Sequence, residues 1–427
     1  MTQTERSGYG AGAKILSIGI ASTGLVTFAY FSVASYALND VDYKAISLLW
    51  SVLFVIVSVI YRPIEQLLSR TIAERRARGL ESDHPLRTPL LIQGAFALAF
   101  LAIALVLKDQ IVELFDGETA LYWVLVAAVL FYAASYFARG WLAGHQWFAL
   151  YGALVFMEAT TRLLFAVAVA IGIATGQSVV AMGMAAAPLV SLIVVPWAFS
   201  RRPKAGERKR AADSELSLAR GGRFAVAVLL IMIAEQTLIN GGVLVAEFTS
   251  SDAAVAGYVF NALLIARAPL QLFQAVQGSL LPHLAGLEAR QGRAEFGHAV
   301  RITILAIAGF AGAVALGLLV LGPFAMGILF DDEASYGRFG LAAVALGMGA
   351  HLAAGTLNQA ALARDHAPAA AAAWLVSAAA FIGWMLFDVV DDTLLRAEVG
   401  YLGAATLLCV LLGLVYRRPG APPAAAV

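Results

Sequence analysis

The stretch RRPKAGERKRAADSELSLARGGR, residues 201–223, is the one long polar stretch in the middle of this 427-residue chain. Long apolar segments precede and follow it. Each is long enough to cross a hydrocarbon core of roughly 30 Å at about 1.5 Å per helical residue. In lipid, each must be helical to satisfy its own backbone hydrogen bonds. The sequence therefore predicts an all-α polytopic membrane protein with about twelve transmembrane helices in two bundles of about six.

The stretch also sets the expected domain boundaries. Residues 1–200 are expected to form an N-terminal six-helix bundle, residues 201–221 a basic cytoplasmic linker and residues 222–427 a C-terminal six-helix bundle. The apolar segments lie near residues 14–37, 44–62, 88–107, 119–138, 147–172, 178–199, 222–246, 253–281, 299–322, 337–363, 367–388 and 399–416.

Composition excludes several classes of protein. Hydrophobic residues make up 61% of the chain and charged residues 13%, against about 25% charged in a soluble domain. No basic stripe with a nucleic-acid-binding fold behind it is visible, so no nucleic-acid partner is expected. The single cysteine, Cys409, rules out an intrachain disulfide and argues against a thiol metal site.

Lys and Arg residues are concentrated on one side of the expected membrane topology, which predicts the orientation of the chain in the membrane. About 23 of the 29 Lys and Arg residues fall in alternate connections, the ones that the positive-inside rule assigns to the cytoplasm. The intervening connections are short and acidic. Both termini are thus expected in the cytoplasm. The Ala- and Gly-rich, Lys-poor usage suggests a bacterium, and hence its plasma membrane.

The connections are too short to house a catalytic domain, since none exceeds roughly 25 residues, against a usual domain size of about 50 or more. The sequence carries no phosphate-binding loop of the Gly-x-x-x-x-Gly-Lys-Ser/Thr type. We therefore expect that the protein is not an enzyme and binds no cofactor. The one small ion considered is H⁺ or Na⁺, as a coupling ion. Function must be sought in the few polar groups at membrane depth.

Glu158 and Arg162 are four residues apart in one segment, with the carboxylate first, which favours an ion pair on one helix. Two interpretations stay open. The pair can serve only to lower its own insertion cost of about 2.5–3.5 kcal/mol per charge. Alternatively, Glu158 holds Arg162 so that it points into a central cavity.

Glu235 has no basic partner within its own segment. It is a candidate for a protonated carboxyl, a proton- or cation-responsive group, or the partner of an Arg elsewhere. Arg267 lies near the middle of its segment and is followed by Pro269, where a kink is expected. That arrangement suggests an anion-binding charge beside a hinge, or else a structural pair with Glu235.

Amides and a histidine supply the remaining polarity. Asn358 and His351 are seven residues apart and share a helical face. Lining of a cavity and hydrogen bonding between helices are equally good explanations. No second ligand stands at a suitable spacing from His351, which argues against a metal site. The other amides are Asn240, Asn261 and Gln359.

Two further features have simple explanations. Residues 63–79 place Ile64, Leu68 and Ile72 on one face before a run of arginines, as in a helix lying in the cytoplasmic interface; a charged stop-transfer region is the alternative. Trp50 falls near a segment end, where the interfacial aromatic belt accounts for it.

The stretches Ala266–Leu270 (ARAPL) and Gln277–Pro282 (QGSLLP), together with Arg62-Pro63-Ile64-Glu65-Gln66, carry a resemblance to a known family. They resemble the polysaccharide-export branch, the Wzx-type flippases, of the multidrug/oligosaccharidyl-lipid/polysaccharide (MOP) transporter superfamily. The resemblance covers essentially the whole chain. The peptidoglycan-precursor flippases of the superfamily usually have two additional helices that this chain lacks.

The resemblance implies a V-shaped, pseudo-twofold pair of lobes that opens alternately to either side of the membrane. It implies flipping of a polyprenyl-pyrophosphate-linked oligosaccharide for cell-surface polysaccharide. Arg162 and Arg267 would hold the pyrophosphate, and Asn240, Asn261, Asn358 and Gln359 the sugars. Coupling or ion pairing would be the role of Glu158, Glu235 and His351. Pro269 would act as a hinge. Expected partners are the lipid-linked glycan, the bilayer, and a polysaccharide polymerase or glycosyltransferases. The alternative is a cation-coupled exporter of drugs or small metabolites.

Overall fold

The computed structural model describes residues 22–77, 86–196, 218–250, 252, 254–265, 293–330, 336–364, 366–387 and 389–418. Most of the basic linker, residues 201–217, lies outside these ranges, as do Arg267 and Pro269. The expectations for those residues therefore remain predictions from the sequence.

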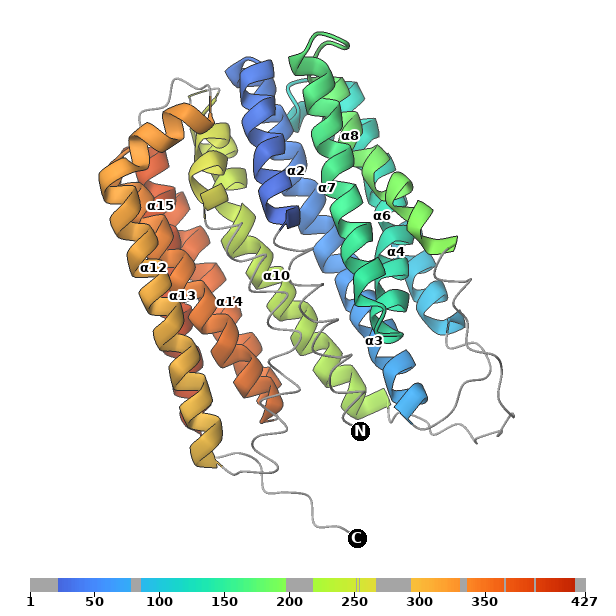
Figure 1. Cartoon of the computed structure of the whole chain (residues 1–427), viewed down its shortest axis with the longest axis vertical. Helices are drawn as coiled ribbons and strands as arrows, with labels where there is room; N and C mark the ends of the chain where they lie inside the picture. Colours follow the sequence, from blue (N-terminus) through green and yellow to red (C-terminus); the bar gives the residue numbers. More distant parts are fainter. Residues whose placement is uncertain are drawn as a thin grey trace. The chain divides into compact units, whose positions relative to one another are not determined.

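The described residues form helices and no strands, which confirms the all-α prediction (Figure 1). Their bounds are α2 Asp40–Ile60, α3 Arg62–Ala77, α4 Arg87–Val106, α5 Lys108–Leu114, α6 Thr119–Gly144, α7 Phe148–Ala170, α8 Gln177–Ser191, the 3₁₀ turn η1 Leu192–Val194, α10 Leu218–Thr249, α12 Arg293–Leu329, α13 Arg338–Ala363, α14 Ala367–Leu386 and α15 Thr393–Arg417. Residues 22–37 and Val255–Ile265 are also helical.

Ten helices in the described part of the chain are long and apolar enough to cross a membrane. The protein is thus a polytopic membrane protein. Ten of the twelve expected segments correspond to these spans. The other two begin or end outside the described residues, and each has a described helical part, 22–37 and Val255–Ile265.

Helix ends follow local capping. Asn39 caps α2 by accepting a hydrogen bond from the Asp42 amide at 2.9 Å. Asp392 caps α15 by accepting from the amides of Leu394 and Leu395. A side-chain oxygen at this position satisfies amides that have no partner within the helix. This is why α15 begins at Thr393, six residues before the expected start at 399.

The contacts divide the chain into two compact units, Met1–Leu216 and Ser217–Val427. In the first unit, α6 packs against α3 and α8, and α7 packs against α8. In the second, α13 packs between α12 and α15, and α10 packs against α14.

Helix α3 does not present its apolar face to the membrane interface, so that interpretation of residues 63–79 is corrected. Ile64, Leu68 and Ile72 are all buried, and α3 packs on α6. Glycines on α6 allow the close approach: a Cβ at Gly140 would lie 2.9 Å from the backbone oxygen of Glu65. The apolar stripe is matched by a second helix that the pattern of one segment cannot reveal.

Candidate functional site

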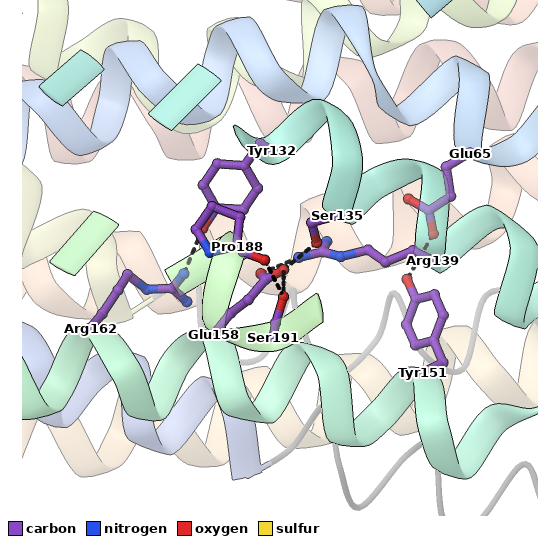
Figure 2. A network of polar contacts seen from close by, with 9 residues as sticks. All are labelled: Glu65, Tyr132, Ser135, Arg139, Tyr151, Glu158, Arg162, Pro188 and Ser191. Carbon is purple, nitrogen blue, oxygen red and sulfur yellow. Dashed lines mark hydrogen bonds and ion pairs between the residues drawn. The ribbon is translucent and has the colours of Figure 1, made fainter. Parts of the chain in front are cut away.

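A network of polar and charged side chains crosses the interior of the first unit (Figure 2). At its centre is the Glu158 carboxylate on α7, which is 1% exposed. It forms an ion pair with the Arg139 guanidinium of α6 and accepts a hydrogen bond from the Ser135 hydroxyl of the same helix. The Ser191 hydroxyl, at the end of α8, lies 3.4 Å from the same carboxylate oxygen. Three helices thus contribute to one buried carboxylate site.

Glu158 does not pair with Arg162, contrary to what their spacing predicts. Both side chains leave α7 toward α6 and then diverge, Glu158 toward Arg139 and Arg162 toward Tyr132 (Figure 2). The physical reason is tertiary. Spacing along one helix shows which side chains can meet, whereas α6 supplies Glu158 with a guanidinium and a hydroxyl together.

Arg162 is 3% exposed and rests among aromatic side chains. Its Nη1 donates a hydrogen bond to the Tyr132 hydroxyl at 2.7 Å. Its guanidinium carbon lies 5.1 Å from the ring centroid of Trp50 and 5.9 Å from that of Phe54. Within the described residues, no carboxylate forms an ion pair with Arg162, and its Nε has no hydrogen-bond partner.

These contacts are strong enough to keep the charge in place. A desolvated cation–π contact contributes about 2 kcal/mol, and a hydrogen bond from a charged group about 1.5–3 kcal/mol. Together they are comparable to the insertion cost of about 2.5–3.5 kcal/mol for an Arg at membrane depth. These contacts can therefore offset the cost of Arg162 at membrane depth, and its Nε donor is left over.

Trp50 and Arg139 are among the residues of this site whose roles the sequence did not reveal. Trp50 is only 5% exposed and packs on Arg162, so its assignment to the interfacial belt is corrected. Arg139 lies one residue beyond the expected segment end at residue 138, whereas α6 continues to Gly144. The pair Ser135 and Arg139, one helical turn apart before Gly140, was the available signal.

The network extends from Arg139 to Glu65. The Arg139 guanidinium carbon lies 4.4 Å from the ring centroid of Tyr136. Beyond it, the Tyr151 hydroxyl of α7 donates to Glu65 of α3 at 2.9 Å. With every group ionised, two carboxylates and two guanidiniums balance to zero net charge. Only the Glu158–Arg139 couple is an ion pair in direct contact among these four.

Two predicted site residues of α13, Asn358 and His351, have partners within the second unit. The Asn358 oxygen accepts from the Trp374 indole at 3.1 Å, and His351 Nδ1 lies 3.2 Å from the Tyr401 hydroxyl. These contacts join α13 to α14 and to α15. Such interhelical bonding is one of the two explanations that the sequence left open.

The remaining candidates are spread along the second unit. Asn240 donates to Gln236 at 3.0 Å within α10, and Asn261 donates to the Tyr336 hydroxyl at 3.3 Å. Glu235 and Gln359 are half-buried. In the part of the chain that the structure describes, no three His, Cys, Asp or Glu side chains are placed to hold a metal ion.

Comparison with solved structures places the fold. A multidrug resistance MATE-family transporter of the MOP superfamily, in an inward-facing conformation, matches with a TM-score of 0.66 and 13% identity over 94% of this chain and 97% of its own. The lipid II flippase MurJ matches with a TM-score of 0.70 and 12% identity, over 93% of this chain and 86% of its own. A MOP-superfamily transporter from Pyrococcus furiosus matches with a TM-score of 0.67 and 13% identity, over 95% and 94%. No protein-family model matches the sequence, and a search of curated proteins finds no relative.

The chain therefore has the fold of the MOP-superfamily transporters. The likeness extends over nearly all of its length and includes both a multidrug transporter and a lipid II flippase. At such low identity it establishes the fold alone.

Proposed function

We propose that the protein is a transporter that flips a polyprenyl-pyrophosphate-linked oligosaccharide from the cytoplasmic to the outer face of a bacterial plasma membrane. In this proposal both termini are cytoplasmic, and the glycan is destined for a cell-surface polysaccharide. The observation that carries it is Arg162, a guanidinium at membrane depth that forms no ion pair with any described carboxylate and retains an unused donor. A buried cation in this state suits an anionic ligand.

The chemistry of the substrate fits such a site. A guanidinium presents donors in a planar fork that matches phosphate oxygens, and such charge-assisted hydrogen bonds are about twice as strong as neutral ones. In the sequence, Arg267 is the second candidate cation and Pro269 the hinge beside it. Asn240, Asn261, Asn358 and Gln359 are proposed to meet sugar hydroxyls, while the polyprenyl tail stays in lipid. Rocking of one bundle against the other would then carry the head group across.

A cation-coupled exporter of drugs or small metabolites is the second candidate. It is favoured by the likeness to a multidrug MATE-family transporter over 94% of the chain. In that case the half-buried Glu235 on α10 would be the ion-coupling carboxyl, and the basic side chains at membrane depth would have structural roles.

Deletion of the gene separates the two candidates. Polyprenyl-pyrophosphate-linked glycans are extracted from the deletion strain, and the membrane face that they occupy is determined. The flippase proposal expects a complete lipid-linked repeat unit to accumulate on the cytoplasmic face, with loss of surface polysaccharide. A plasmid copy of the wild-type gene should reverse both effects. Normal export with no stalled intermediate would exclude the flippase and favour the exporter.

A further inference from the structure

Glu158 stands one helical turn before Arg162 on α7, and its ion-pair partner Arg139 belongs to the neighbouring helix α6. Glu158 precedes Arg162 by four residues on α7, a spacing at which the two side chains can meet on one helix face. A carboxylate in contact with Arg162 would occupy the donors that an anionic ligand needs. The site at Arg162 can work only if Glu158 is held elsewhere.

The structure holds Glu158 on the side away from Arg162. One carboxylate oxygen accepts from Ser135 and lies 3.4 Å from the Ser191 hydroxyl, and the other is paired with Arg139. The Ser191 hydroxyl also donates to the Pro188 backbone oxygen at 2.8 Å, which fixes its position on α8. Both oxygens are thus engaged by side chains of α6, and the Ser191 hydroxyl of α8 lies beside one of them (Figure 2).

We propose that Arg139 is a positioning residue that keeps Glu158 away from Arg162, so that the Arg162 guanidinium stays available to the pyrophosphate of the substrate. This inference rests on the proposed function, because it assumes that an anion binds at Arg162. Arg139 itself does not touch the ligand. It acts by satisfying the carboxylate that would otherwise compete for the same cation.

The alternative pairing is the expected result of removing Arg139. A buried carboxylate left without a cation is more costly than the loss of one hydrogen bond. Arg162, on the same helix, can therefore give up its hydrogen bond to Tyr132 in order to pair with Glu158. Both residues of the native site remain in such a variant, but the cation is neutralised. Removing Glu158 as well should undo the effect.

The experiment measures binding of radiolabelled geranylgeranyl pyrophosphate to the purified full-length protein in nanodiscs, with geranylgeraniol as the control for binding of the tail alone. Arg139→Met should weaken pyrophosphate-dependent binding about tenfold, the equivalent of one hydrogen bond to a charged group. The double variant Arg139→Met/Glu158→Gln should recover most of it. Arg139→Lys, which keeps a cation beside Glu158, should bind more tightly than Arg139→Met.

The outcomes separate this inference from the proposed site. Arg162→Gln should lose pyrophosphate-dependent binding in either case, and unchanged binding would refute the anion site itself. If Arg162→Gln binds the pyrophosphate weakly while Arg139→Met binds it as tightly as the wild type, Arg139 has no positioning role. A double variant that elutes as a folded protein but binds as weakly as Arg139→Met would also overturn the inference. If Arg139→Met does not fold, the double variant and Arg139→Lys provide the test instead. Weak pyrophosphate-dependent binding by both would refute the inference.

Discussion

Tyr132 contributes the one hydrogen bond that Arg162 makes among the described residues, and its effect on stability can be isolated. Tyr132→Phe removes this 2.7 Å bond and leaves the ring in place. Bonds to charged groups contribute about 1.5–3 kcal/mol and neutral ones about 0.5–1.5 kcal/mol. Tyr122→Phe is a matched control, because the Tyr122 hydroxyl donates to the neutral backbone oxygen of Ala104 at 3.0 Å in the same unit.

We expect Tyr132→Phe to lower the thermal unfolding midpoint in detergent more than Tyr122→Phe does, as followed by intrinsic fluorescence. Equal shifts for the two variants would mean that Arg162 draws little stabilisation from Tyr132. A larger shift for the control would contradict the account of how the buried charge is held.

At the scale of single residues, the sequence identified the positions of interest better than their partners. It singled out Glu158 and Arg162 because charges at membrane depth are costly. It paired Glu158 with Arg162 and not with Arg139, because helical spacing carries no information about a neighbouring helix. Trp50 was assigned to the interface for the same reason: the side chains that pack on it, such as Phe31 and Arg162, come from other helices.

Close packing of α3 on α6 depends on Gly140, and this contact gives a prediction for the element scale. An added Cβ would lie 2.9 Å from the Glu65 backbone oxygen, which cannot move without shifting α3. Gly140→Ala should therefore destabilise the protein by about 1–3 kcal/mol, the usual cost of overpacking.

Gly94 on α4 is the matched control, since it is exposed and an added Cβ would meet nothing within 4 Å. Gly94→Ala should be neutral or stabilising by about 0.5–1 kcal/mol, because alanine loses less backbone entropy than glycine in a helix. The unfolding midpoint is thus expected to fall for Gly140→Ala and to stay unchanged or rise for Gly94→Ala. Destabilisation by both variants to the same extent would show that α3 and α6 are not closely packed at Gly140.

The apolar segments themselves were predictable, because a membrane demands about 20 apolar residues per helix and leaves a strong signal. The ends of the helices were less predictable. Helix α6 runs beyond its expected end and carries Arg139 into the interior, where the apolar pattern had already stopped. The apolar stripe of α3 was visible in the sequence, but its docking on α6 was not, since hydropathy reports contact with an apolar environment and cannot distinguish lipid from protein.

For the whole molecule, the two compact units and the likeness to MOP-superfamily transporters agree with the architecture that the basic stretch 201–223 suggested. The fold serves both exporters and a lipid II flippase, so substrate must be argued from side chains. The side chain that distinguishes the hypotheses is Arg162. A flippase of pyrophosphate-linked glycans would use its charge to bind substrate, whereas in a cation-coupled exporter of drugs or small metabolites Arg162 would have a structural role.

The most direct measurement is therefore flipping by the purified protein in liposomes. A fluorescent polyprenyl-pyrophosphate-linked oligosaccharide is placed in both leaflets, and its transfer is followed by quenching with a membrane-impermeant reductant. Wild-type protein should move the lipid, and Arg162→Gln, shown to be folded by size-exclusion chromatography, should do so at least about tenfold more slowly, as expected for the loss of a charge-assisted contact. Equal rates for the two proteins would contradict the central role of Arg162, and no flipping by either would contradict the flippase itself.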